Sequence, residues 1–391
     1  MSASRTSGIR LARVFGIELR LDWSVLLIFA LIVASLGTGV FPLWHPDWSP
    51  ALVWIVALAA GLLFFASLLA HELSHSLVAK RHGIDVPRIT LFLFGGAAEM
   101  ASEPPTPSVE FRVAIAGPIM SAVLGIGFTV LSVNLAGREF SDALVANPEQ
   151  AIASLSPLAT VLFWLGPVNL VLAIFNMIPG FPLDGGRVLR ALLWGWTGDQ
   201  LKATRWASEA GRIFAWILMG GGVVYLLGGA AVQGIWLILI GWFLSHMAQS
   251  SYTQLVMQRA LGRLHVRDLM RTRFDTVDAN VPLPRFVDEY LLRSGQAVWP
   301  VRDGERIVGV VSLAQLTEVP AERRNALLAR DVMTPLDRLA AVDPELAGRA
   351  AFERVSSGGD EPVPVLEGNT LVGFLHRSDI LRWLSLHGIA A

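Results

Sequence analysis

The sequence predicts a polytopic α-helical membrane protein followed by a soluble α/β domain, and three observations support this prediction. Hydrophobic residues make up 53% of the 391 residues and charged residues only 16%, whereas charged residues make up about a quarter of an ordinary soluble protein. Long apolar runs alternate with short polar breaks as far as about residue 260. The residues beyond have the composition of a soluble protein and contain an internal repeat. We therefore expect a tail at residues 1–21, a membrane domain at 22–255, and two soluble repeats at 263–325 and 326–391.

Six apolar runs in the membrane domain are long enough to cross a bilayer. A helix rises about 1.5 Å per residue, so about 20 residues cross the roughly 30 Å of hydrocarbon. Helices are expected for these runs, because backbone amides that face lipid must be paired within their own segment. The six runs are Trp23–Phe41, Leu52–Val78, Phe111–Val133, Leu158–Ile178, Ala207–Gly229 and Val232–Gln249.

The basic residues predict the orientation of these spans, because Lys and Arg are enriched in cytoplasmic loops. They gather before the first span and after the second and fourth spans, whereas the opposite connections contain only Arg138. We therefore expect a multi-pass protein of the plasma membrane with both termini in the cytoplasm. The basic residues on that side are Arg5, Arg10, Arg13, Arg20, Lys80, Arg81, Arg88, Arg187, Arg190, Lys202 and Arg205.

The segment between the second and third spans, Ile84–Met100, is too short to span and is rich in β-branched and aromatic residues. Within it, the stretch Ile89–Phe94 is followed directly by Gly95-Gly96. This pattern predicts a β-hairpin held against the helices. The alternative is a loop that lies on the membrane surface.

One motif carries the predicted chemistry: His71-Glu72-Leu73-Ser74-His75 lies within the second span. Two histidines four residues apart project from one face of a helix, and Glu72 is placed to take a proton from water on a metal ion. At helical rise, His71 lies roughly 13 Å below the cytoplasmic surface, which Lys80 marks. Ionisable groups at that depth are costly and usually functional. The chain has no cysteine, so a metal must be held by His, Asp or Glu.

A catalytic zinc site needs a third protein ligand beside the two histidines. His82 lies on nearly the same helical face but beyond the charged boundary of the membrane, and Glu99 is a downstream carboxylate. Asp184 follows the fourth span among Pro and Gly residues that break the helix, and a carboxylate in that apolar setting needs a cation. Asn176, at the end of the same span, has an amide that would hold a substrate carbonyl.

The motif at His71–His75, followed about a hundred residues later by Asn-x-x-Pro and Leu-Asp-Gly-Gly at Asn176–Gly186, resembles the site-2 protease family of intramembrane zinc metalloproteases. The six-span layout and the element Ala116-Gly117-Pro118 are similar too, and the resemblance covers about residues 10–255. It implies that His71, His75 and Asp184 bind one zinc ion, with Glu72 as catalytic base and Asn176 in contact with substrate. It also implies regulated intramembrane proteolysis of a single-span or membrane-bound protein near its cytosolic end.

The soluble part contains two similar halves. Arg267-Asp268-Leu269-Met270 recurs as Arg330-Asp331-Val332-Met333, and Val308–Val311 recurs as Val372–Leu375. Two halves with one spacing predict a pseudo-symmetric pair packed face to face. Each half ends with two short strands and a helix, which in the first half are expected at Ala297–Val301, Arg306–Val311 and Ser312–Thr317.

The two halves resemble a tandem CBS (Bateman) pair. Such pairs commonly bind adenine nucleotides through a Gly-φ-φ-Ser/Thr-x-x-Asp signature whose Asp holds the ribose. The first half has Ser312 but Gln315 in place of the Asp, and the second keeps Asp379 but has His376 in place of Ser or Thr. The resemblance implies either a modulating adenine nucleotide at Ser312 and Asp379 or a structural pair that forms a homodimer. The net charge of −1 gives no reason to expect nucleic acid as a partner.

A CBS-gated ion transporter or channel is the alternative function, since CBS pairs also follow ion-transport domains. His71, Glu72 and Asp184 would then line a cation path. The spacing favours the protease, because a transporter has no need for two histidines four apart with a Glu between them.

Overall fold

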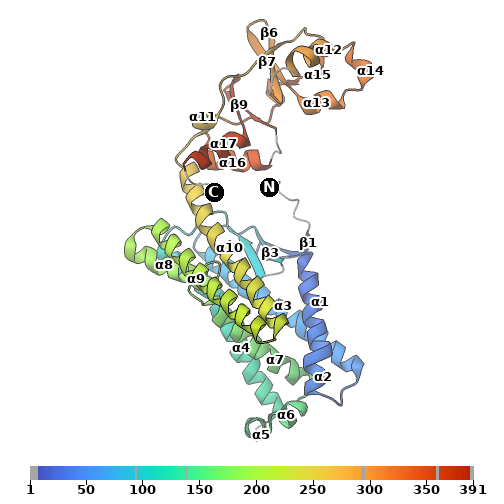
Figure 1. Cartoon of the computed structure of the whole chain (residues 1–391), viewed down its shortest axis with the longest axis vertical. Coiled ribbons are helices and arrows are strands. Elements are labelled where there is room, and N and C mark those ends of the chain that lie inside the picture. Colours follow the sequence, from blue (N-terminus) through green and yellow to red (C-terminus); the bar gives the residue numbers. More distant parts are fainter. Residues whose placement is uncertain (1–7, 93–94, 138, 292–295, 358–360, 388–391) are drawn as a thin grey trace. The chain divides into compact units, whose positions relative to one another are not determined.

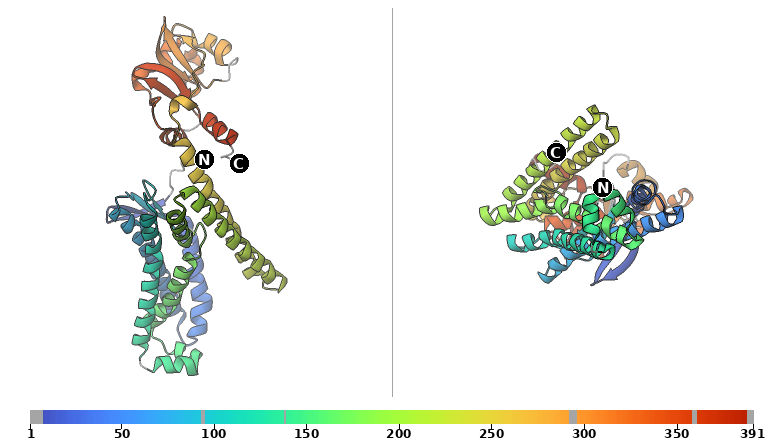
Figure 2. Two further views of the ribbon diagram at one scale, coloured as in Figure 1. Left: turned by 90° about the vertical axis from the view of Figure 1, so that its left-hand side faces the viewer. Right: turned by 90° about the horizontal axis from the view of Figure 1, so that it is seen from below.

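A computed structural model of the chain (Figure 1) describes residues 8–92, 95–137, 139–291, 296–357 and 361–387. The chain divides into two compact units between Tyr252 and Thr253. The first unit consists of long helices and one small sheet, and the second consists of short strands and helices (Figure 2).

Among the described residues, six helical segments are long and apolar enough to cross a membrane, which confirms the predicted polytopic fold. Three of them share a start signal, because Ser49, Thr106 and Ser156 each cap a helix and precede a proline. Each side-chain oxygen accepts a hydrogen bond from a first-turn N–H, and the proline lacks a donor that would otherwise be unpaired there. The six are Ser24–Trp44 (α1 Ser24–Ser35, the π-helical turn η1 Leu36–Val40 and α2 Phe41–Trp44), α3 Pro50–Arg81, α4 Pro107–Ala136, α7 Pro157–Asn176, α9 Gln200–Leu227 and α10 Ala231–Leu261.

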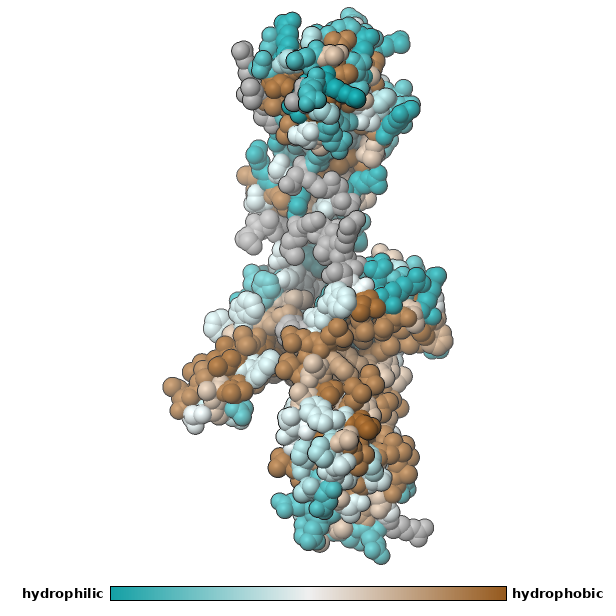
Figure 3. All heavy atoms as spheres, turned by 90° about the vertical axis from the view of Figure 1, so that its right-hand side faces the viewer, coloured by the Kyte–Doolittle hydropathy of each residue, from teal (hydrophilic) through white to brown (hydrophobic). Residues whose placement is uncertain are grey.

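The outer surfaces of these helices are apolar. Large side chains such as Leu27, Ile174 and Trp216 are exposed, and Figure 3 shows hydrophobic residues gathered over the long helices. Such a surface is what a helix in contact with lipid requires. Between helices, small residues allow close approach: a Cβ added to Gly166 of α7 would lie 2.2 Å from Thr129 Oγ1 of α4.

The α4 helix is central in the first unit, because it packs against α3, α7 and α8. Shorter helices make the connections between the spans. These are α5 Phe140–Ala146 and α6 Pro148–Ala153 between α4 and α7, and α8 Asp184–Thr197 between α7 and α9.

A four-stranded sheet in the first unit has the order β1-β2-β3-β4. The strands β3 (Arg88–Phe92) and β4 (Gly95–Glu99) pair antiparallel, which confirms the predicted hairpin. Leu93 and Phe94, the end of the stretch predicted for it, lie outside the described residues. Ile89 of β3 is buried with Leu68 of α3 and Val113 of α4, so the hairpin is held against the helices as expected.

The tail at residues 1–21 contains structure that the sequence did not predict. Its strands β1 (Gly8–Val14) and β2 (Ile17–Asp22) form a hairpin, and β2 pairs in parallel with β3. The turn between them has positive φ at Phe15 and Gly16, as a two-residue hairpin turn requires. β2 alternates buried Ile17 and Leu19 with charged residues, but it has only six residues and its partner β3 lies far along the chain.

In the second unit, the two halves have matching strand pairings. Around β6 and β7 of the first half, β5 pairs in parallel with β6, and β8, which comes from the second half, pairs antiparallel with β7. Around β9 and β10 of the second half, the parallel bridge Val342–Val365 and the antiparallel bridge of Arg271, from the first half, with Phe374 occupy the same places. The predicted strands and helix of the first half are β6, β7 and α13, each within two residues of its predicted bounds.

The two halves also share a core, because Val298 and Val310 of the first half are buried in one cluster with Leu371 and Phe374 of the second. The first half contains α11 Val266–Leu269, β5 Val277–Asp278, α12 Leu283–Phe286, η2 Val287–Leu291, β6 Val298–Asp303, β7 Arg306–Ser312, α13 Leu313–Glu318 and α14 Ala321–Arg324. The second contains α15 Ala329–Val332, β8 Thr334–Pro335, η3 Leu336–Arg338, α16 Gly348–Ser357, β9 Val363–Glu367, β10 Thr370–Leu375 and α17 Arg377–Leu386.

Candidate metal centre

The structure brings His71, His75 and Asp184 together. Both histidines lie on α3 and are buried, and their Nε2 atoms are 3.2 Å apart. Asp184 is the first residue of α8, and its Oδ2 lies 3.1 Å from each Nε2. Within the described ranges, no other three His, Asp or Glu residues converge in this way.

The opposite ring nitrogens of the histidines contact α4. His75 Nδ1 lies 2.6 Å from the Val113 carbonyl oxygen, and His71 Nδ1 lies 2.8 Å from Ser121 Oγ. A carbonyl only accepts hydrogen bonds, so His75 Nδ1 carries the proton and its Nε2 presents a lone pair in the neutral ring. Hydrogen bonds of this kind orient metal-binding histidines.

The convergence of these atoms fits a metal ion. Lone pairs of two imidazoles and a carboxylate repel one another at about 3 Å unless a cation lies between them. Ligands about 2.0–2.1 Å from a tetrahedral zinc ion are themselves separated by about 3.3–3.4 Å, close to the observed 3.1–3.2 Å. Two neutral histidines and one carboxylate are a donor set that catalytic zinc sites use.

Gly117 of α4 leaves the room that this cluster needs. A Cβ at this position would lie 2.2 Å from His75 Nε2 and 2.6 Å from His71 Nε2. Any side chain at residue 117 would therefore occupy the space in which the ligand atoms meet.

The loop before Asp184 is fixed by close backbone contacts. A Cβ at Gly185 would lie 2.4 Å from the Met177 carbonyl, and one at Gly186 would lie 2.3 Å from the Phe181 nitrogen. The Phe181 N–H donates to the Ala207 carbonyl of α9 at 3.1 Å. These contacts fold residues 177–183 tightly, so that α8 begins with Asp184 at the histidines.

Glu72 lies next to the cluster on α3 and is partly exposed. A Cβ at Gly96 of β4 would lie 2.4 Å from Glu72 Cγ, so β4 covers this side chain. The Glu72 carboxylate thus lies between the group formed by His71, His75 and Asp184 and the last strand of the sheet.

The other candidate residues lie outside the cluster. His82 ends α3, where its Nδ1 contacts the Val78 carbonyl at 2.9 Å. Glu99 accepts a hydrogen bond from Arg88 at 3.3 Å. Asn176 ends α7 and is partly exposed, and its Nδ2 donates to the Leu172 carbonyl at 3.0 Å.

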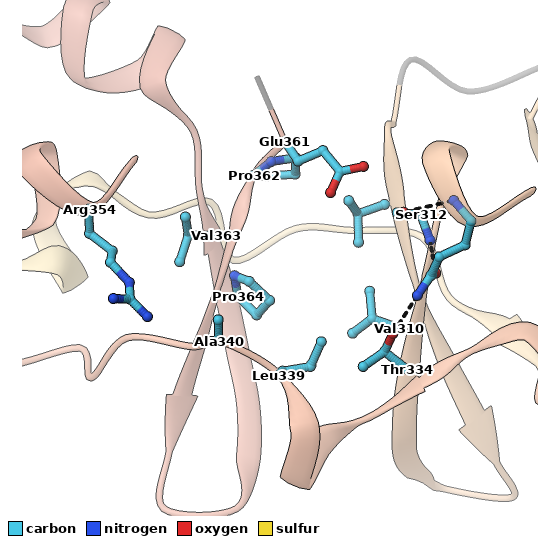
Figure 4. Close-up of a pocket in the computed structure, with 12 residues that line it drawn as sticks. Val310, Ser312, Thr334, Leu339, Ala340, Arg354, Glu361, Pro362, Val363 and Pro364 are labelled. Carbon is cyan, nitrogen blue, oxygen red and sulfur yellow. Dashed lines mark hydrogen bonds between the residues drawn. The ribbon is translucent and has the colours of Figure 1, made fainter. Parts of the chain in front are cut away.

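In the second unit, Ser312 and Gln315 of the nucleotide signature line a cavity of about 360 Å³ (Figure 4). Ser312 caps α13 by accepting from the Gln315 N–H, and Gln315 also contacts Thr334. Arg354 lies on the opposite side of the cavity from Ser312, and Glu361 also lines it.

The corresponding place in the other half is nearly closed. Arg271 donates two hydrogen bonds of 2.6 Å to Asp379, and the pocket beside them has a volume of only about 50 Å³. Burial and the neighbouring Arg271 guanidinium lower the pKa of His376, which lines this pocket. The sequence did not predict the ion pair, because Arg271 and Asp379 lie more than a hundred residues apart.

Comparisons with known proteins agree with this division. Residues 59–218 match Peptidase family M50, and residues 266–322 and 329–386 match the CBS domain. The chain is 35% identical over 98% of its length to "Putative zinc metalloprotease Rip3" of Mycobacterium tuberculosis, covering 94% of that protein. It is 28% identical over 97% of its length to "Zinc metalloprotease MJ0392" of Methanocaldococcus jannaschii, covering 96% of that protein. The match to a solved structure, the site-2 protease from M. jannaschii, covers 63% of this chain and 95% of the solved chain, with 31% identity and a TM-score of 0.42. The chain belongs to Peptidase family M50, the site-2 proteases, and carries a tandem pair of CBS domains.

Proposed function

We propose that this chain is a zinc-dependent endopeptidase that hydrolyses peptide bonds in or near the transmembrane segments of membrane-bound proteins. The observation that carries the proposal is the convergence of His71, His75 and Asp184 beside Glu72. Membership of a peptidase family and the names of the relatives support this class of reaction. They also weigh against a CBS-gated ion transporter.

His71, His75 and Asp184 would hold one zinc ion. When bound, such an ion supplies Lewis-acid activation of water and of the scissile carbonyl. Glu72 accepts the proton of the attacking water and passes it to the departing amine nitrogen. Asn176, held at the end of α7 by its bond to Leu172, donates its amide to the substrate carbonyl oxygen as negative charge develops there.

The substrate must be extended at the cleavage point, because a helix hides its carbonyls in its own hydrogen bonds. Such a substrate would need a free strand edge, and β3 offers none because it is paired on both sides, with β2 and β4. In the described sheet, the edge strand that lies next to Glu72 is β4. An extended substrate that pairs with Gly95–Glu99 would replace its lost helical hydrogen bonds.

The protein is a multi-pass membrane protein. We place it in the plasma membrane, and the distribution of Lys and Arg supports both termini in the cytoplasm and an active site near the cytoplasmic side. Cleavage from that side would release cytosolic parts of membrane-held proteins.

The CBS pair is proposed to modulate the protease by binding an adenine nucleotide. The cavity at Ser312 supports this, since its volume of about 360 Å³ falls within the about 300–1,000 Å³ typical of ligand sites. Asp379 can hold a ribose only after Arg271 releases it. The alternative is a structural pair that forms a homodimer.

The proposed protease is tested by metal analysis and cleavage of a single-span substrate by the purified chain. Glu72→Gln is expected to keep the zinc and to lose cleavage, because the variant retains the ligands and removes the base. His71→Ala and Asp184→Ala are expected to lose both. Cleavage by Glu72→Gln at the wild-type rate would refute the role of Glu72, and undiminished zinc in His71→Ala would refute the metal site.

A further inference from the structure

A buried ion pair joins the two helices that support the metal centre. Glu110 lies in the first turn of α4 and is fully buried, and Arg190 of α8 is 8% exposed. Arg190 Nε donates to Glu110 Oε1 at 2.5 Å, and Nη2 contacts the same oxygen. Glu110 Oε2 has no hydrogen-bond partner in the part of the chain described.

Glu110 lies on the face of α4 that supports the histidines. Val113, Gly117 and Ser121 lie three, seven and eleven residues after it, and this spacing places all four on one side of a helix. Val113 and Ser121 contact the histidine Nδ1 atoms, and Gly117 lies against both Nε2 atoms.

Arg190 lies on the helix that carries the third ligand. It follows Asp184 by six residues, or about 9 Å along α8, whereas Gly117 follows Glu110 by seven residues, or about 10.5 Å along α4. The two packed helices therefore meet at two points, the ion pair and the candidate metal centre. The distance between these two points is nearly the same along α4 as along α8. A slip of one helical turn, about 5.4 Å, would separate both points.

Arg190 also contacts the loop that leads to Asp184. Its guanidinium carbon lies 5.3 Å from the centre of the Phe181 ring, at a distance typical of a cation–π contact. Phe181 is three residues before Asp184 and is bonded through its N–H to α9. One side chain thus holds α4, α8 and this loop together.

We propose that Glu110 and Arg190 are positioning residues that set the register of α8 on α4 and so place Asp184 against the two imidazoles. This inference rests on the proposed metal site. A buried ion pair adds little stability compared with apolar residues of the same size, and its best-supported role is to specify register. The first turn of α8 after Asp184 has two glycines, which have no side chains that could fix the register of α8 on α4.

The test measures zinc affinity by competition with a chelator, together with thermal unfolding of the full chain in detergent. Glu110→Gln and Arg190→Met are expected to weaken zinc binding by about 10–100-fold, as loss of supporting contacts around metal ligands typically does. The double variant Glu110→Leu/Arg190→Met fills the space with apolar side chains. It is expected to unfold near the wild-type temperature yet to bind zinc as weakly as the single variants.

Thr160→Val is the matched control, because it removes a buried hydrogen bond to His45 between other elements. It is expected to keep wild-type zinc affinity. Wild-type affinity in the double variant would overturn the proposal and leave the pair a packing role only. Zinc affinity that is unchanged by His71→Ala would overturn the metal site itself, and this inference with it.

The cobalt-substituted protein gives a second readout that does not depend on activity. If the pair places Asp184, the visible spectrum of cobalt in the double variant differs from that of the wild type, because the ligand geometry has changed. An identical spectrum in all variants would contradict the proposal.

Discussion

Two glycines leave the space that the side chains of the proposed active site occupy. Gly117 faces the two Nε2 atoms, and Gly96 faces Glu72. Neither position has a positive φ, so backbone strain does not account for them. A side chain at either position would occupy the space of the proposed metal ligands or of the proposed catalytic base.

Gly117→Ala is expected to abolish zinc binding and cleavage, because its Cβ would lie 2.2 Å from His75 Nε2. Metal content of the purified variant gives the measurement. Gly127→Ala on the same helix is the control, since no atom lies within 4 Å of a Cβ there. Full zinc occupancy in Gly117→Ala would show that α4 does not confine the ligands as described.

Gly96→Ala is expected to have a different effect. Its Cβ would displace Glu72 and leave the three metal ligands untouched, so zinc content should stay unchanged. Cleavage should fall on the order of 100-fold, because a displacement of about 1 Å at a catalytic group has an effect of this size. Loss of zinc in this variant would instead indicate that β4 supports the histidines.

Among the secondary-structure elements, the small sheet carries the proposed substrate edge beside the proposed catalytic base Glu72. β1 and β4 are its edge strands, and β4 is the one that covers Glu72. The inner face of the sheet is held by Ile17 and Ile89 against α3 and α4. The proposed catalytic base on α3 and the proposed substrate edge on β4 therefore belong to elements that pack against each other.

A proline scan of a single-span substrate tests the role of β4. Only every second residue of an added strand donates its N–H to the edge, and proline has no N–H to donate. Cleavage is therefore expected to fall at alternate substrate positions and to persist at those between them. Equal loss at every position near the cleavage site would indicate helix unwinding alone and exclude strand addition.

At the scale of the whole molecule, the two signature sites of the soluble pair differ: the cavity at Ser312 is open, whereas the pocket beside Asp379 is small and Asp379 is engaged by Arg271. AMP at 100 times its Kd is expected to stabilise the protein by about 2.7 kcal/mol, seen as a rise in unfolding temperature. Ser312→Ala removes the cap of α13 and is expected to lower the unfolding temperature without nucleotide. The quantity to compare with the wild type is therefore the rise in unfolding temperature on adding AMP.

The variant Asp379→Ala shows which of the two sites binds AMP. If AMP binds at Ser312 alone, the shift persists in this variant, whereas binding at Asp379 requires the shift to disappear. The absence of any shift with AMP or ATP in the wild type would favour the structural, dimerising pair. Measurement of the molecular mass in solution would then decide whether a homodimer forms.

The sequence by itself was sufficient for the features that depend on local patterns. The six spans follow from apolar length, the pairing of His71 and His75 from helical spacing, and the CBS repeat from internal similarity. Each of these depends on residues close together in the chain or on a pattern that occurs twice.

Only the tertiary structure decided which distant groups meet. Local patterns left His82 and Glu99 open beside Asp184, which the family resemblance implied, and the structure places Asp184 at the histidines. β1 and β2 extend the sheet, and Arg271 engages Asp379. These contacts join segments that no local periodicity relates. They arise from side-chain packing between helices and strands, where a glycine or a buried ion pair determines how closely and in which register two elements pack.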